Sequence, residues 1–219
     1  MEAIIYTGLC IGAFAAADRA ITQKGFENPY YAVHAIHNAL IVAFSMSDVL
    51  NTFTKFHELH QFHTNWTVVY LCFALHIYHM LVYWRSLRFD DWLHHGLMIG
   101  VALPIGCLIE SHTFLGLNLF FTTGLPGGID YVLLFAVRNG YMYRHTEKNI
   151  NTFLNVWIRS PGCVAMAALS LAATLSSSEY DATTLVRLIP SLLTYWNGQY
   201  FMQQVVTDSA RIGWINLGN

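Results

Sequence analysis

Residues 65–84 read NWTVVYLCFALHIYHMLVYW, a run of twenty residues without Asp, Glu, Lys or Arg. A helix of about 20 mostly apolar residues is long enough to cross a lipid bilayer. Two histidines, His76 and His79, nevertheless lie within the run. Ionisable groups are costly inside hydrocarbon, so in membrane helices they mostly face a cavity, a partner or a pathway. The stretch therefore predicts a transmembrane helix whose two histidines are candidates for a function.

The rest of the chain has the same apolar character. Of its 219 residues 55% are hydrophobic and 11% are charged, and the mean hydropathy is +0.41. Soluble domains carry roughly a quarter charged residues. We therefore expect an integral membrane protein with an all-α fold, a polytopic bundle of seven spans in a single domain, 1–219. Besides 65–84, the expected spans are 2–18, 30–52, 91–110, 113–137, 153–176 and 184–206.

One of these spans, 113–137, contains the run GLPGG at 124–128. In a helix interior, proline removes a backbone donor and clashes with the preceding turn. We expect the run to break or kink the helix. Backbone groups that are freed at membrane depth need protein or water partners, so this span is a candidate for lining a cavity.

Basic residues indicate how the spans are oriented, because cytosolic connections carry an excess of Lys and Arg. Connections on one side hold only Lys55, and their 177–183 loop is acidic through Glu179 and Asp181. The basic residues of the other side are Arg19, Lys24, Arg85, Arg88, Arg138, Arg144, Lys148 and Arg211. We expect the N-terminus to lie outside or in the lumen and the C-terminus to lie in the cytosol.

Two kinds of function receive no support from the sequence. The formal net charge is −2 and no basic tract is present, so we expect no nucleic-acid partner. The cysteines Cys10, Cys72, Cys107 and Cys163 stand singly in apolar segments without CxxC spacing. We interpret them as small core residues rather than as disulfides or zinc ligands.

Histidines recur in pairs on three of the spans, and they are the main functional signal. With the orientation above, all of them lie in the cytosolic third of the bilayer, and Asp130 lies at a similar depth. Residues three apart share a helix face, so both rings of a spaced pair can point the same way. We call this set the imidazole cluster: His34, His37, His76, His79, His94 and His95.

Three interpretations of the imidazole cluster remain open from the residues alone. Histidine titrates near neutrality, so the cluster could act as acid, base or acyl acceptor on an acyl group. Neutral imidazole also suits iron, zinc or copper. Membrane di-iron oxygenases carry denser histidine boxes, however, and we predict no metal and no resident cofactor. In the third interpretation, each ring only hydrogen-bonds a neighbour near a helix end.

Polar residues outside the imidazole cluster receive simpler interpretations. His57, His60 and His63 form an HxxHxxH pattern in an outer loop. The pattern could bind a divalent ion, but we interpret it as a solvated polar loop. Asp48, at the outer end of its span, is also expected to be solvated. Arg159 is expected to extend to the cytosolic headgroups.

Three segments together resemble a known family. They are AVHAIH at 32–37, HMLVYWRSLRFDDWLHH at 79–95 and YWN at 195–197. Their order resembles the TLC-domain family, the membrane group that includes the ceramide synthases, over about residues 28–210. That family carries a helix-borne His-His pair after a short cytosolic hairpin, as the second segment does. Because no His-Asp-x-Ser-Asp element follows, the chain looks like the divergent members that are linked to lipid composition or sensing.

The resemblance implies binding or modification of a lipid acyl chain. The natural reaction is an acyl transfer with acyl-CoA as co-substrate. His94 or His95 would act as base or transient acyl acceptor, oriented by Asp130 or His79. The basic hairpin would meet the phosphates of the donor. The expected substrate-binding residues are His34, His37, His76, Arg85, Arg88 and Asn197.

The expected location is the endoplasmic reticulum or another endomembrane. The expected partner is a membrane lipid or acyl chain, and the expected assembly is a homo-oligomer or a larger membrane complex. The alternative function is a non-catalytic structural or assembly subunit of such a complex. That alternative predicts histidines that are scattered and individually hydrogen-bonded.

Overall fold

The computed structural model describes residues 2–108, 113–175 and 182–217, and this part of the chain is all-α, as predicted. It forms seven helical rods, three of which consist of consecutive helices. The rods are α1 (Glu2–Gln23), α2 (Pro29–Thr54), α3 (Trp66–Val82), α4 (Phe89–Leu97) with α5 (Leu103–Leu108), α6 (Phe114–Leu119) with α7 (Leu125–Arg138), α8 (Arg144–Leu154) with α9 (Ser160–Leu175), and α10 (Ala182–Leu217). The acidic residues Glu179 and Asp181 of the expected outer loop lie outside the described residues.

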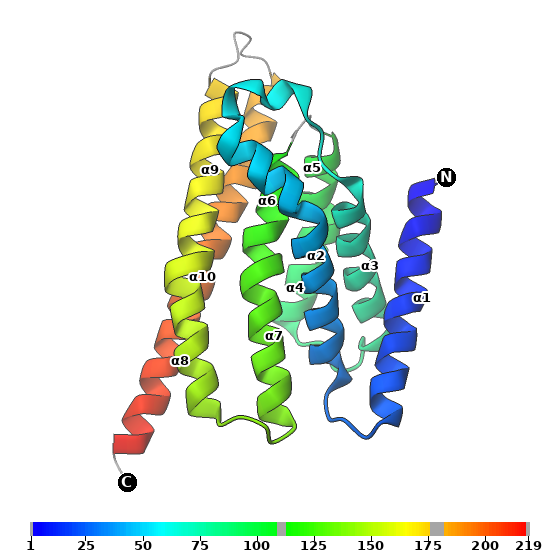
Figure 1. The fold of residues 1–219 in the computed structure, drawn as a ribbon, viewed down its shortest axis with the longest axis vertical. Coiled ribbons are helices and arrows are strands. Elements are labelled where there is room, and N and C mark those ends of the chain that lie inside the picture. Colours follow the sequence, from blue (N-terminus) through cyan, green and yellow to red (C-terminus); the bar gives the residue numbers. More distant parts are fainter. Residues whose placement is uncertain (1, 109–112, 176–181, 218–219) are drawn as a thin grey trace.

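The rods run alternately up and down, so that the two ends of the chain lie at opposite ends of the bundle (Figure 1). A short 3-10 helix, η1 (Phe56–Gln61), lies between α2 and α3. The strongest contacts join α9 to α10, α2 to α7 and α1 to α3. At the edge of the bundle, Asp18 of α1 accepts hydrogen bonds from the hydroxyls of Tyr78 and Tyr83.

The largest apolar core lies where α1, α2 and α3 meet. Phe14 of α1, Val33 and Ile41 of α2, and Val68 and Tyr78 of α3 are buried in it. Burial of such side chains is favourable by roughly 25 cal/mol per Å² of apolar surface removed from water. The core therefore fixes α2 and α3, the two helices that carry four of the six histidines, relative to each other.

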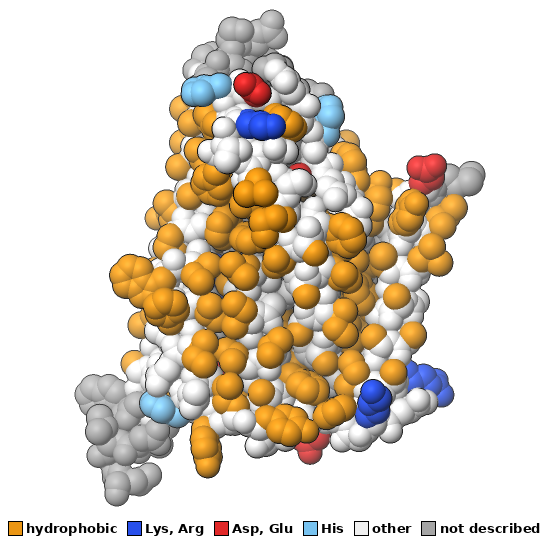
Figure 2. All heavy atoms as spheres, in the orientation of Figure 1, with side chains coloured by type: hydrophobic (Ala, Val, Ile, Leu, Met, Phe, Trp, Pro, Cys, Tyr) orange, Lys and Arg blue, Asp and Glu red, His pale blue; other side chains and the backbone are white. Residues whose placement is uncertain are grey.

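The outside of the bundle is apolar over most of its length. Rods 2–23, 29–54, 114–138 and 144–175 are each long and apolar enough to cross a membrane, and α3 is apolar but shorter. On the face drawn in Figure 2, hydrophobic side chains form a broad band between charged groups near the two ends. The protein is therefore an integral membrane protein. The number of seven spans and their orientation stay predictions.

Three rods each contain one π-helical segment. The segments are η2 (Met98–Ala102), η3 (Phe120–Gly124) and η4 (Asn155–Arg159). In each, a backbone N–H bonds to the carbonyl five residues earlier, for example from Leu125 to Phe120. Such π turns are rare and occur frequently at functional sites.

Of the break or kink expected at the glycine- and proline-containing run 124–128, the break is not found, because the rod continues through the run. The helix passes through η3 and continues as α7, with Pro126 in the first turn of α7. A proline is tolerated in a first turn because its missing N–H is not needed there. The irregularity is therefore the π segment that precedes the proline.

Asp48 is buried, with 2% of its surface exposed, and the expectation that it is solvated is wrong. Gly116 of α6 lies directly against its carboxylate, because a glycine has no side chain to keep the two rods apart. Asp48 also accepts a hydrogen bond from the backbone N–H of Asn65, at 3.3 Å. The close approach of α2 and α6 thus covers a carboxylate that the sequence places at the membrane surface.

We predict that Gly116→Ala lowers the stability of the protein, because a Cβ at this position would overlap the Asp48 carboxylate. Overpacking of this kind costs about 1–3 kcal/mol. The matched control is Gly12→Ala, since no atom lies within 4 Å of a Cβ there. Thermal unfolding in detergent, followed by circular dichroism, measures the difference. Equal unfolding temperatures for the two variants would contradict the packing described here.

Candidate functional site

The imidazole cluster is divided into two groups of rings. In the first group, His34 of α2 stacks on His79 of α3, with ring centroids 4.1 Å apart. Tyr131 of α7 stacks on His34 at 4.1 Å, and Tyr30 stacks on His79 at 4.6 Å. Both imidazoles are buried. The first group is therefore a packed aromatic stack that joins three rods.

The second group joins α3 to α4. The His76 ring lies 5.5 Å from that of His94 and 5.2 Å from that of His95, measured between centroids. His95 also lies 5.5 Å from His79, so it connects the two groups. His76 and His95 are buried, whereas His94 is exposed. The structure thus brings together imidazoles that the sequence places on three separate spans.

Hydrogen bonds to backbone carbonyls orient one ring in each group. The Nδ1 atom of His34 lies 2.7 Å from the carbonyl oxygen of Tyr30, and that of His76 lies 2.7 Å from the carbonyl oxygen of Cys72. A carbonyl only accepts, so Nδ1 carries the proton and donates. In the neutral ring, Nε2 then keeps its lone pair. These rings can therefore accept a proton or bind a metal ion through Nε2.

His37 does not share in the ring contacts of either group. It is fully buried, its Nδ1 lies 2.8 Å from Oδ1 of Asn38, and its nearest aromatic neighbour is Phe14. The same Asn38 oxygen accepts a hydrogen bond from the hydroxyl of Thr123 in η3, at 3.0 Å. His37 therefore supports the packing of α2 on η3 and takes no part in the ring contacts of the two groups.

A partly open cavity of about 180 Å³ adjoins the second group. His76 and His94 form part of its wall. The other lining residues come from α3, α5, α6, α7, α10 and the three π segments. Its apolar wall includes Leu103, Leu115 and Leu193. Each of the three π segments contributes to the lining, as does Pro190 within α10. The helix irregularities therefore converge on a single cavity beside the imidazoles.

Three polar side chains of the cavity wall have an atom without a hydrogen-bond partner in the protein. These atoms are Oδ1 of Asp130, Nε of Arg159 and Oδ1 of Asn197. Buried polar groups are rarely left unpaired, so these atoms are available to water or to a bound polar group. Within the described residues, Asp130 shares the cavity with His94 but forms no hydrogen bond with it. Asp130 therefore does not orient that ring as the sequence suggested.

Arg85 and Arg88 lie in the connection between α3 and α4, outside the cavity. The guanidinium of Arg85 stacks over the Trp84 ring at 5.0 Å. Arg88 is well exposed, and its Nε lies 3.7 Å from a carboxylate oxygen of Asp91. Both arginines are therefore accessible at the end of the bundle from which α4 carries His94 and His95 inward.

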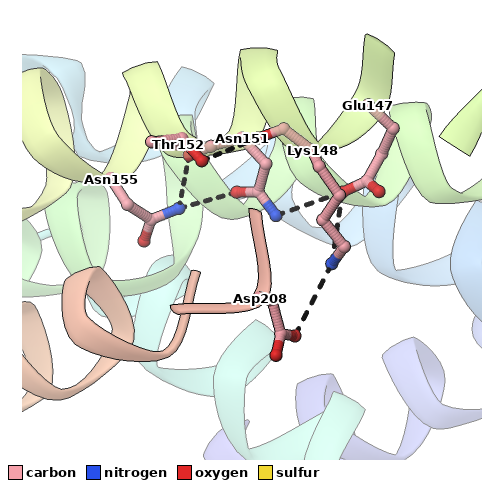
Figure 3. Close-up of polar contacts among 6 residues, drawn as sticks. All are labelled: Glu147, Lys148, Asn151, Thr152, Asn155 and Asp208. Carbon is pink, nitrogen blue, oxygen red and sulfur yellow. Dashed lines mark hydrogen bonds and ion pairs between the residues drawn. The ribbon is translucent and has the colours of Figure 1, made fainter. Parts of the chain in front are cut away.

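A buried polar ladder, missed in the sequence, leads along α8 to the cavity. Asn151 donates to Glu147 at 3.3 Å, and Asn155 donates to Asn151 at 2.6 Å (Figure 3). Arg159 completes the ladder by donating to Oδ1 of Asn155 at 3.1 Å. At the end of the ladder away from the cavity, Nζ of Lys148 lies 3.8 Å from a carboxylate oxygen of Glu147 and 3.9 Å from one of Asp208 in α10. The spacing of four residues, which places all four side chains on one helix face, was the signal in the sequence.

The structure corrects the prediction that Arg159 extends to the cytosolic headgroups. Its side chain is buried with 6% exposed, lines the cavity and lies over the Phe201 ring at 4.8 Å. The ladder supplies the polar partner that an arginine needs inside a membrane. His57, in η1, is exposed, but the HxxHxxH pattern also depends on His60, whose side chain lies outside the described part.

Comparison of the chain with protein-family models, with curated proteins and with solved structures finds no match. The resemblance to the TLC-domain family is thus left untested, and function has to be argued from the geometry of the imidazole cluster and the cavity.

We predict that Asn155→Leu destabilises the protein by about 1–3 kcal/mol, because it leaves Arg159 and Asn151 without their buried partner. The control is Asn149→Leu, at an exposed position on the same helix. Thermal unfolding of the two purified variants measures the difference. If both variants unfold together with the parent protein, the ladder does not stabilise the bundle.

Proposed function

We propose that the protein acts on the acyl group of a membrane lipid, at the place where His76 and His94 meet the cavity. One observation carries this proposal. Inside a membrane protein, a ring with a free Nε2 lone pair faces a cavity that has both an apolar wall and unpartnered polar groups. A cavity of comparable volume takes up a benzene molecule. The space therefore suits the carbonyl end of an acyl chain.

The proposed reaction is an acyl transfer. An acceptor hydroxyl or amine gives its proton to an imidazole nitrogen, and its lone pair forms a bond to the acyl carbonyl carbon. The bond from that carbon to the leaving group then breaks, and the leaving group departs with the electron pair and takes the proton. His94 is the imidazole proposed to exchange the proton, because it lines the cavity and is also exposed. His76 lies beside it in a fixed orientation.

The other predicted residues receive supporting roles in this proposal. Asp130 and Asn197 would hold the polar part of the lipid, since each has an unpartnered atom at the cavity wall. Arg85 and Arg88 would bind the phosphates of an acyl-CoA donor, because guanidinium groups match phosphate geometry and both are accessible. His79, behind His95, has an unpartnered Nε2 that could share the proton.

A non-catalytic subunit of a larger complex is the rival function. It requires each histidine to be satisfied by its own hydrogen bond. Nε2 of His79 and Nδ1 of His95 are buried without a hydrogen-bond partner. These two atoms therefore favour a ligand-binding site over the non-catalytic subunit. Lipid sensing without turnover remains part of the proposal, because it would use the same cavity and the same unpartnered groups.

We propose further that the protein is a divergent relative of the TLC-domain family and resides in the endoplasmic reticulum. The hairpin that leads into α4 supports the family proposal, since His94 and His95 lie on a helix directly after it. Microscopy of the tagged full chain tests the location. Absence of the tagged protein from the endoplasmic reticulum would refute the proposed location.

We predict that His94→Ala lowers acyl transfer by about 10²–10⁴-fold, the contribution typical of a positioned acid or base. The assay incubates the full chain in phosphatidylcholine vesicles with radiolabelled palmitoyl-CoA and, in turn, a lysophospholipid, a diacylglycerol and a long-chain amine. The control is His57→Ala, because His57 is exposed and does not line the cavity. Equal turnover in the two variants would refute the role of His94.

A second measurement tests binding without knowledge of the acceptor. A palmitate analogue with a photoreactive diazirine near its carboxyl end should label cavity residues such as Met98 and Asn118. Labelling that is confined to exposed positions such as Leu81, which is 65% exposed, would show that the cavity takes up no acyl group.

A further inference from the structure

The second group of rings has the geometry of a metal site. His76, His94 and His95 each offer one nitrogen, and the three nitrogens lie within 4.8 Å of one another. We propose that these three histidines bind one divalent transition-metal ion of the zinc type. The site itself is independent of the proposed function, and only the role that we give to the ion rests on it.

The distances suit such an ion with small movements of the rings. Zinc binds histidine nitrogen at about 2.0–2.1 Å in tetrahedral sites, which places two ligand nitrogens about 3.3 Å apart. The separations of up to 4.8 Å therefore close with shifts of about 1 Å, which side-chain rotations supply. Neutral imidazole is also the ligand that zinc and its neighbours prefer among nitrogen donors.

The surroundings of His76 and His95 support the assignment. His76 donates its Nδ1 proton to the carbonyl of Cys72, and metal-ligating histidines almost always donate their second nitrogen to such a partner. His95 is 4% exposed, and its Nδ1 has no hydrogen-bond partner. An unpaired buried nitrogen is costly. Coordination of an ion by Nδ1 of His95 would supply the partner that this nitrogen lacks.

The two groups of rings differ in a way that limits the site to one ion. His34 and His79 lie face to face, with an angle of 29° between their planes. Imidazole lone pairs lie in the ring plane, so stacked rings do not direct them at a common point. His76 and His95 are instead nearly perpendicular, at 88°. The second group is also the one in which three histidine nitrogens lie within 4.8 Å of one another.

The proposed ion would keep an open coordination position toward the cavity, because His76 and His94 both line it. Three protein ligands and one open position are the pattern of catalytic zinc sites, whereas structural sites are closed by four protein ligands. The ion would lower the pKa of a bound water or acceptor hydroxyl and polarise the acyl carbonyl. His94 would then activate the acceptor by holding the ion instead of by taking its proton directly.

The test measures metal in the purified full chain. The protein is extracted in detergent, stripped with a chelator, loaded with Zn²⁺ or Co²⁺ and freed of excess metal. We expect one ion per chain by mass spectrometry of the metal, and visible absorption bands of tetrahedral Co²⁺. X-ray absorption of the zinc-loaded parent protein should show imidazole nitrogens at about 2.0–2.1 Å. This last measurement needs no variant and therefore does not depend on the folding of one.

Variants locate the ion. His76→Ala and His95→Ala should each lower the affinity for Co²⁺ by at least about tenfold, whereas the triple replacement His57→Ala, His60→Ala and His63→Ala should retain one ion per chain. Loss of the ion only in the triple variant would place it in the outer loop and overturn the proposal. A metal content well below one ion per chain in the loaded parent protein would also overturn it.

Metal content and acyl turnover separate the two proposals. Acyl transfer that continues after complete removal of metal would refute the role given to the ion and leave the proposed function intact, whereas the metal content decides whether the site itself exists. One bound ion at His76, His94 and His95, without acyl transfer and without labelling of the cavity, would support the metal site and refute the acyl function.

Discussion

The structure of the site depends on one constraint, which is that imidazoles inside a membrane must find hydrogen-bond partners within the protein. His34 and His76 meet it by donating Nδ1 protons to carbonyls of their own helices, four residues earlier. This bond places a proton on Nδ1 and holds each ring against its helix. Because only one nitrogen is used, the other stays free for chemistry.

The cavity follows from a second constraint, that backbone groups at membrane depth must remain bonded. A helix that simply stopped would leave them unpaired. The π segments η2, η3 and η4 instead keep the rods continuous while they disturb the regular packing of the helices. Together with Pro190 they line the cavity. The ladder from Glu147 to Asn155 then holds the guanidinium of Arg159 at the wall of the cavity.

Much of the fold could be predicted because hydropathy is a local property of the chain. The all-α bundle and the membrane setting follow from long apolar stretches, and His94 and His95 do lie on a helix that follows a basic hairpin. The burial of Asp48 could not be predicted in the same way, because it depends on Gly116, which lies far away in the sequence. The burial of Arg159 could not be predicted either. It follows from the hydrogen bond to Asn155, one helical turn away, and from the cavity that Arg159 lines.

The sequence by itself determined that this protein is helical and embedded in a membrane, and that its histidines come in pairs on three helices. Only the tertiary structure decided which of them meet. It separated the stacked pair of His34 and His79 from the converging set of His76, His94 and His95. The physical reason is that ring orientation depends on the rotation of each rod and on contacts with neighbouring rods, and neither is encoded in the spacing of residues along one helix.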